Sequence, residues 1–314
     1  MDNIKNVLTR EESAVFALRA LYSDYGYTRY KMSKFEEYDL YVRNKDFLVS
    51  DGIITFTDTD GRLLALKPDV TLSIIRNSRD NSDGLIKVQY NENVYRVSGG
   101  THNFKEFMQV GLECLGAVGD KEITEVLLLA AKSLDLISPD NILEISHLDI
   151  VRGVLRAFDV KEDAQKRITA YLGQKNVNGI AEVCTAEGIS ECGLALIKKL
   201  ATVYGAPSDV LPALEEFRIN TEIGKAIDQL AGITAALSSF GIDKKLCIDF
   251  SLVGNMKYYN GIAIRGFVDG IPSGIISGGQ YDNLMRKMGR SSRAIGFAVY
   301  LDELEKFNMT ESFS

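Results

Sequence analysis

The apolar and polar positions of residues 106–114 alternate strictly along the chain. Side chains of a strand point alternately to opposite faces, so this pattern predicts a strand with one apolar face. The apolar face holds Met108, Val110, Leu112 and Cys114, and the other face holds Gln109, Gly111 and Glu113. A glycine in mid-strand lets another group approach the backbone closely. The polar face therefore predicts either the floor of a small-molecule site or a solvated outer face with a glycine at a bulge.

The patterns in the rest of the first half predict a mixture of strands and helices. Thr9 and Glu12 form a capping box for a helix that ends at Gly26, and residues 27–42 are predicted to be extended. Asp69 can cap a helix that begins beside it, because its carboxylate can accept the unpaired backbone N–H groups. Further strands are predicted at 53–57, 63–66, 86–90, 94–97 and 142–146, and further helices at 123–136 and 149–158.

Helical periodicity replaces alternation between residues 161 and 239, which predicts four or five short helices. Beyond them the patterns predict, in order, a strand at 246–250, a hairpin of 261–268 and 271–277 across Asp269-Gly270, a turn at 277–282 into a helix at 283–288, and a last helix at 295–307. The predicted fold class is α+β, with an antiparallel sheet flanked by helices and a helical insertion at 161–239.

Composition narrows the classes of function. The chain has 314 residues, of which 46% are hydrophobic and 25% charged, as in ordinary globular proteins. A net charge of −7 argues against a protein whose main task is to grip phosphate backbones, so no tRNA groove is expected. No apolar run approaches the roughly 20 residues of a membrane helix, and the polar start gives no signal peptide. The scattered four cysteines and only two histidines predict a cytoplasmic protein without disulfides or a His-rich metal site.

Four segments, in this order, resemble the histidyl-tRNA synthetase family, whose core is a class II antiparallel sheet. They are Lys67-Pro68-Asp69-Val70-Thr71, Val94-Tyr95-Arg96 with Lys105–Cys114, Tyr258-Tyr259-Asn260-Gly261, and Gly278–Asp282 with Ala294–Ala298. They are similar, respectively, to that family's Arg-Pro-Glu-Gly-Thr segment, class II motif 2, the histidine-specific Tyr-Tyr-Thr-Gly, and the run into motif 3. The resemblance implies one class II synthetase-like core over residues 1–314, with the helical insertion inside it.

The departures from that family concern its nucleotide chemistry. The arginine that contacts the activated carboxylate is matched by Gly254, and the motif 3 arginine that holds ATP phosphates is matched by Glu303. The motif 2 loop at 97–104 lacks the family's acidic-arginine pair, and Ser33 stands at the motif 1 proline. The chain also ends where an anticodon-binding domain would begin. Adenylate formation needs cationic groups on the transferring phosphoryl group, so the resemblance implies no catalysis by this chain.

The amino-acid pocket of the family is retained, in Asp69, Thr71, Arg96, Gln109, Glu113, Tyr258 and Tyr259. The resemblance implies that Glu113 and Asp69 pair with an ammonium group, that Arg96 lies near a carboxylate or stabilises Glu113, and that Gln109 holds a further polar atom. Tyr258 and Tyr259 would lie against an imidazole ring, although by themselves they also fit ordinary strand aromatics. The implied ligand is free histidine.

A retained pocket with lost catalysis is similar to the regulatory subunit family of ATP phosphoribosyltransferase. That resemblance implies a hetero-oligomer with the short-form catalytic subunit, self-association as a dimer, no cofactor or metal, and histidine feedback inhibition of the first step of histidine biosynthesis. Two alternatives stay open: a truncated synthetase-like enzyme that activates an amino acid, and a free-standing amino-acid sensor. A pyrophosphate exchange assay would identify the first, and failure to bind a catalytic chain would favour the second.

Overall fold

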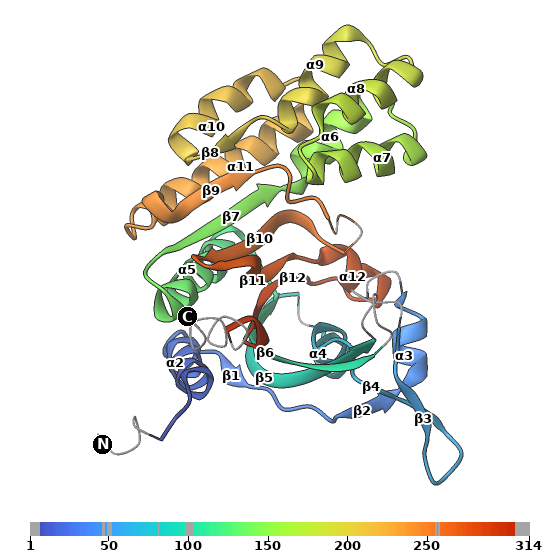
Figure 1. Cartoon of the computed structure of the whole chain (residues 1–314), viewed down its shortest axis with the longest axis vertical. Helices are drawn as coiled ribbons and strands as arrows, with labels where there is room; N and C mark the ends of the chain where they lie inside the picture. The colour runs from blue at the N-terminus through green and yellow to red at the C-terminus, as the bar shows by residue number, and fades with distance from the viewer. Residues whose placement is uncertain are drawn as a thin grey trace.

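The computed structural model describes residues 7–45, 48, 52–80, 82–97, 103–254, 256 and 258–304. Within these residues the chain folds around one large sheet of nine strands, and a second sheet of three short strands lies beside it (Figure 1). The larger sheet has the order β1-β5-β6-β12-β11-β10-β7-β9-β8, and the smaller has the order β2-β4-β3. The predicted α+β class is confirmed.

The strands of the larger sheet are β1 (Thr28–Arg29), β5 (Leu85–Val97), β6 (Phe104–Gly116), β7 (Asn141–His147), β8 (Tyr204–Gly205), β9 (Leu246–Asp249), β10 (Asn260–Val268), β11 (Ile271–Gln280) and β12 (Arg293–Tyr300). Neighbouring strands pair antiparallel, apart from the parallel pairs β1/β5 and β7/β9 near the two edges. The smaller sheet is made of β2 (Phe35–Glu37), β3 (Thr55–Thr57) and β4 (Leu63–Leu66).

Helix α5 (Asp120–Ile137) packs against β7, β10 and β12, and α2 (Arg10–Asp24) packs against α5. The predicted capping box of α2 is present: Glu12 N–H donates to Thr9 Oγ1 at 3.1 Å, and Thr9 N–H donates to Glu12 Oε2 at 2.9 Å. Three short helices, α3 (Tyr38–Val42), α4 (Thr71–Asn77) and α12 (Asp282–Lys287), lie at the other end of the sheet.

Residues 161–239 form the helical module, which lies at the top of Figure 1. Its helices are α7 (Glu162–Gly173), α8 (Val177–Ala186), α9 (Glu191–Leu200), α10 (Pro207–Ala213) and α11 (Thr221–Ser238), with one 3-10 turn at Leu214–Phe217. Helix α6 (Leu148–Ala157) joins the module to the sheet, because it contacts β10 on one side and α9 and α11 on the other. A Cβ on Gly153 of α6 would lie 2.5 Å from Ile223, so this glycine permits the close approach of α11. The two-residue β8 was not predicted.

Four sequence predictions are wrong in detail. The two strands predicted at 86–90 and 94–97 are one strand, β5, because its ladder with β6 continues through the polar residues between them. Within 27–42 the segment 38–42 is helical. The predicted turn at 277–282 is largely strand, since β11 continues to Gln280.

The fourth error concerns the predicted last helix at 295–307, because residues 293–300 form β12. This strand lies between β6 and β11, and its side chains from Ala294 to Val299 are all buried. A strand covered on both faces shows a continuous apolar run instead of alternation, which pattern alone does not distinguish from a helix.

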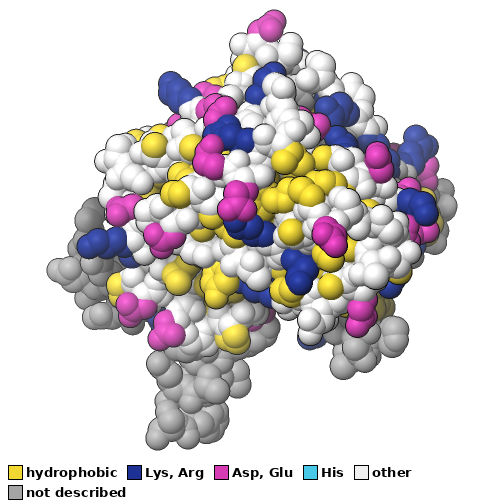
Figure 2. All heavy atoms as spheres, turned by 90° about the horizontal axis from the view of Figure 1, so that it is seen from above, with side chains coloured by type: hydrophobic (Ala, Val, Ile, Leu, Met, Phe, Trp, Pro, Cys, Tyr) yellow, Lys and Arg dark blue, Asp and Glu magenta, His cyan; other side chains and the backbone are white. Residues whose placement is uncertain are grey.

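The helical-module face carries charges of both signs. Figure 2 shows Lys and Arg side chains interspersed with Asp and Glu over the helical-module face, with hydrophobic side chains gathered near its centre. In the part of the chain that the structure describes, no helix combines the length and apolarity that spanning a membrane requires. The same residues contain no cluster of His, Cys, Asp or Glu suited to a metal ion.

Candidate functional site

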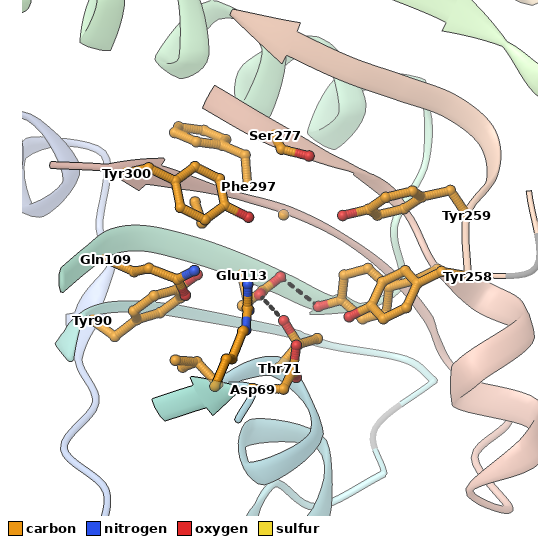
Figure 3. Close-up of a pocket in the computed structure, with 15 residues that line it drawn as sticks. Asp69, Thr71, Tyr90, Gln109, Glu113, Tyr258, Tyr259, Ser277, Phe297 and Tyr300 are labelled. Carbon is orange, nitrogen blue, oxygen red and sulfur yellow. Dashed lines mark hydrogen bonds between the residues drawn. The ribbon is translucent and has the colours of Figure 1, made fainter. Parts of the chain in front are cut away.

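One pocket collects all seven side chains that the sequence singled out (Figure 3). It lies on β5, β6, β11 and β12 and is closed by the start of α4 and by the Tyr258-Tyr259 segment. The atom-free space within it is about 480 Å³, part of which is open to solvent. Lining residues that the sequence reasoning did not select include Tyr90, Ser277, Tyr281, Gly296 and Tyr300. The arrangement is a small polar pocket with aromatic walls.

Glu113 forms the floor of the pocket and is 2% exposed. Its two carboxylate oxygens accept hydrogen bonds of 2.6 Å from Thr71 Oγ1 and from the Tyr281 hydroxyl. Burial raises the pKa of Glu113 to about 8, although both hydrogen bonds act in the opposite direction. Gly296 lies opposite Glu113 in the β6/β12 register, and a Cβ there would lie 1.7 Å from Glu113 Oε2. The glycine therefore makes room for the carboxylate.

The polar face of β6 is a buried face. Gln109 is 4% exposed, so the alternative of a solvated outer face is wrong. The side-chain amide of Gln109 has no hydrogen-bond partner within the described ranges, and it points into the pocket (Figure 3). Gly111 does permit a close approach, but the group that approaches is the protein's own Tyr90, whose hydroxyl would lie 2.4 Å from a Cβ at residue 111.

Asp69 is the second buried carboxylate of the pocket, at 9% exposed. Its Oδ1 accepts a hydrogen bond of 2.9 Å from Leu72 N–H at the start of α4, as predicted for a capping side chain. Burial raises the pKa of Asp69, and the charge of Arg96 acts against that rise. The negative charge of Asp69 also raises the pKa of Glu113, and the charge of Glu36 raises the pKa of Asp69.

Arg96 is the single cationic residue that lines the pocket among the described residues. Its Nε donates to the carbonyl of Pro68 at 3.0 Å, which places the guanidinium beside the residue that precedes Asp69. The described lining of the pocket has one more carboxyl group than it has cations, and burial keeps Glu113 largely protonated in the free protein. A ligand with a positive charge would allow this carboxyl group to ionise, because an opposite charge at short range favours the ionised carboxylate.

Three tyrosines form the aromatic side of the pocket. The ring centroids of Tyr258 and Tyr259 lie 4.6 Å apart with the ring planes at 62°, and the ring of Tyr281 lies 6.0 Å from that of Tyr258. Edge-to-face pairs of this kind are rigid and can present both an apolar ring and a hydroxyl to a planar ligand. In Figure 3 the hydroxyl of Tyr259 points into the cavity, toward Ser277 and Tyr300.

The residues that sequence reasoning missed have identifiable causes. Tyr281 lies within the quoted segment Gly278–Asp282, so its position beside a retained motif was an available signal. Tyr300 pairs in register with Gln109, but it fell within a segment predicted as helix. Tyr90 lies on the strand next to β6, and no sequence pattern pairs it with Gly111.

The departures from the synthetase motifs can be placed as well. Gly254 lies beside α6 and α7 and does not line the pocket, and a Cβ there would meet no atom within 4 Å. The carboxylate of Glu303 accepts a hydrogen bond of 2.8 Å from Ser273 Oγ. Ser33 Oγ accepts one of 3.1 Å from Phe35 N–H. The motif 2 loop lies mostly outside the described residues.

Comparisons with known proteins match this chain over most of its length. Residues 3–304 match the family model described as histidyl-tRNA synthetase. A curated ATP phosphoribosyltransferase regulatory subunit from Acetivibrio thermocellus is 27% identical over 289 residues, which cover 90% of this chain and 68% of the relative.

Two solved structures extend this likeness to the fold. An ATP phosphoribosyltransferase regulatory subunit/histidyl-tRNA synthetase from Bacillus halodurans superposes with a TM-score of 0.84 at 23% identity, over 95% of this chain and 79% of that chain. A chain of the ATP phosphoribosyl transferase (HisG:HisZ) complex from Thermotoga maritima gives a TM-score of 0.71 at 18% identity, over 91% and 96%. The predicted family is confirmed: this chain belongs to the histidyl-tRNA synthetase family, and over 90% or more of its length it is similar to curated ATP phosphoribosyltransferase regulatory subunits.

Proposed function

We propose that this chain activates a short-form ATP phosphoribosyltransferase catalytic subunit and makes it sensitive to free histidine. The chain is similar over 90% of its length to regulatory subunits of that enzyme, which supports the regulatory role in histidine biosynthesis. The catalytic subunit would carry the transfer that joins ATP to phosphoribosyl pyrophosphate. This chain would act as a cytoplasmic, cofactor-free scaffold that self-associates as a dimer and does not bind tRNA.

The excess of carboxyl groups over cations in the described lining of the pocket is the observation that carries the choice of ligand. An α-ammonium group placed between Asp69 and Glu113 would supply a second cation and allow Glu113 to ionise, and charge-assisted hydrogen bonds of this kind are the strong ones. Arg96 lies where it can receive the carboxylate of the same amino acid. An imidazole ring would then lie against Tyr258 and Tyr259, and Gln109 would offer it an amide for hydrogen bonding.

The absence of catalysis in this proposal rests on Gly254 and Glu303. Neither residue supplies the cation that a triphosphate needs, and a carboxylate near a triphosphate is repulsive. Family membership itself favours the rival function, an enzyme that activates an amino acid. Histidine-dependent exchange of pyrophosphate into ATP by the purified chain would establish that rival and overturn the proposal.

Two measurements test the proposal in sequence. Isothermal titration calorimetry of the full chain with histidine should show saturable binding, and glutamine and lysine at the same concentrations serve as controls. Size-exclusion chromatography with a short-form catalytic chain should then show co-elution. Histidine binding without co-elution would favour the free-standing sensor, and absence of binding would refute the ligand assignment.

A further inference from the structure

The segment that carries Tyr258 and Tyr259 has no regular secondary structure over its described residues between β9 and β10. It receives hydrogen bonds from one side chain of α6, Arg152. The Nη2 group of Arg152 donates to the carbonyl oxygen of Tyr259 at 2.7 Å and also to that of Met256. An irregular segment without ladder partners depends on such side-chain donors to satisfy its carbonyl groups.

Arg152 is itself held in place. Its Nη1 group donates to Asp149 Oδ1 at 3.0 Å, one turn earlier on α6, and its side chain is 17% exposed. The planar guanidinium can therefore present its remaining N–H groups to two carbonyl oxygens at once, which an ammonium group cannot do in the same geometry. The orientation of the Tyr258-Tyr259 segment is tied to α6 by this one side chain.

The same arginine also lines a second cavity, which shares no described lining residue with the amino-acid pocket. This second cavity has about 1130 Å³ of atom-free space, part of it open to solvent, and it is lined by α6, α7, Val253, Gly254 and Met256. Met256 lines it together with Arg152, whereas Tyr259 lines the amino-acid pocket. Arg152 thus connects Tyr259, which lines the amino-acid pocket, with Met256, which lines the cavity beside the helical module.

We propose that Arg152 is a positioning residue: it orients the two tyrosines for the ligand, and it couples ligand binding in the amino-acid pocket to α6. This inference rests on the proposed function of the pocket. A ligand packed against Tyr259 fixes the carbonyl that Arg152 contacts, so binding should reduce the local opening of α6. Loss of the guanidinium frees both carbonyl groups, so the tyrosine wall should be less well ordered before binding.

The test compares Arg152→Met with Arg156→Met. Arg156 is one turn further along α6, pairs with Glu222 at 3.3 Å, is 63% exposed and makes no hydrogen bond to residues 256–259 among the described contacts. Arg152→Met should raise the Kd for histidine by about 2- to 30-fold, the range for residues that act through a neighbour, while Arg156→Met should leave it unchanged. Arg152→Lys keeps the positive charge but loses the planar guanidinium that donates to both carbonyl groups, so it should give an intermediate Kd. This variant replaces Arg152→Met in the test if the methionine variant does not fold.

Hydrogen exchange provides the readout that a purely structural role would not change. Histidine should slow amide exchange in residues 148–157 of the wild-type chain and of Arg156→Met, but not in Arg152→Met at saturating histidine. Exchange that slows only around the pocket in the wild type, or equal Kd values for the two methionine variants, would overturn the inference while leaving the proposed ligand intact. Failure of the wild-type chain to bind histidine at all would overturn the proposed function, and this inference with it.

Discussion

Replacement of Glu113 by glutamine removes one ionisable group from the pocket while keeping its shape. A glutamine amide can still hydrogen-bond to Thr71 Oγ1 and to the Tyr281 hydroxyl, because each hydroxyl can also accept. The pKa of Glu113 is raised from about 4.5 to about 8 by burial, so the free protein keeps this side chain largely protonated at pH 7. A ligand ammonium group would bring the pKa down, so binding should release a proton.

The size of the effect on histidine binding follows from that titration. With a pKa of about 8, the ionised fraction of Glu113 rises roughly 50-fold between pH 6 and pH 8, and the affinity of the wild-type chain should rise with it. Titration of the ligand's own imidazole affects both proteins equally, so the ratio of wild-type to Glu113→Gln affinity isolates Glu113. At pH 8 the variant should bind more weakly by on the order of 2–5 kcal/mol, as for other buried charge pairs that lose one partner.

The stability of the free protein provides an independent check with a defined sign. A carboxyl whose pKa is raised on folding stabilises the fold most below its unfolded value, and this contribution is lost as the pH rises through about 8. The wild-type chain should therefore lose roughly 3 kcal/mol of unfolding free energy relative to Glu113→Gln between pH 5 and pH 8. The chain contains no tryptophan, so urea unfolding followed by circular dichroism is the suitable assay. Parallel pH profiles for the two proteins, in both binding and stability, would refute the assignment of Glu113 as the titrating group of the pocket.

Two further substitutions test the geometry around the same carboxylate. Gly296→Ala places a methyl group against Glu113 Oε2, so calorimetry should show loss of histidine binding. Urea unfolding should show a decrease of about 1–3 kcal/mol in the free energy of unfolding. Normal histidine binding by this variant would contradict the close approach of Gly296 to Glu113. Gly232→Ala, on α11, is the matched control, because a Cβ at this position meets no atom within 4 Å. The alanine should stabilise the helix by about 0.5–1 kcal/mol. Tyr281→Phe removes a hydrogen bond that lowers the pKa of Glu113, so its binding profile should shift to higher pH than that of the wild type. An unshifted profile would mean that the Tyr281 hydroxyl does not act on the titrating group.

Much of the pocket could be predicted from the sequence because its polar residues lie in short, ordered motifs. Strict alternation around Gln109 and Glu113 identified a two-faced strand, but it could not decide whether the polar face was buried. That depends on β5 and β12 on either side and on α4 above, which are contacts between distant parts of the chain. The resemblance to the histidyl-tRNA synthetase family supplied the role of each residue, and the pocket geometry is compatible with it.

The errors arose where burial removes the signal on which pattern reasoning depends. Residues 293–300 are covered on both faces, so the strand that carries Gly296 and Tyr300 showed an apolar run and was predicted as a helix. The glycines at 278 and 279 were interpreted as a turn, whereas they lie inside the β11/β12 ladder, where a Cβ on Gly278 would be 2.3 Å from the carbonyl oxygen of Gly296. Close packing of two backbones requires glycine as strictly as a turn does.

The most direct measurement is the rate of phosphoribosyl transfer to ATP by a short-form catalytic subunit, alone, with this chain, and with this chain plus histidine. We expect the chain to raise the rate and histidine to lower it again, with no effect of histidine on the catalytic subunit alone. A rate that does not respond to the chain, or a stimulated rate that histidine leaves unchanged in the wild type, would contradict the account.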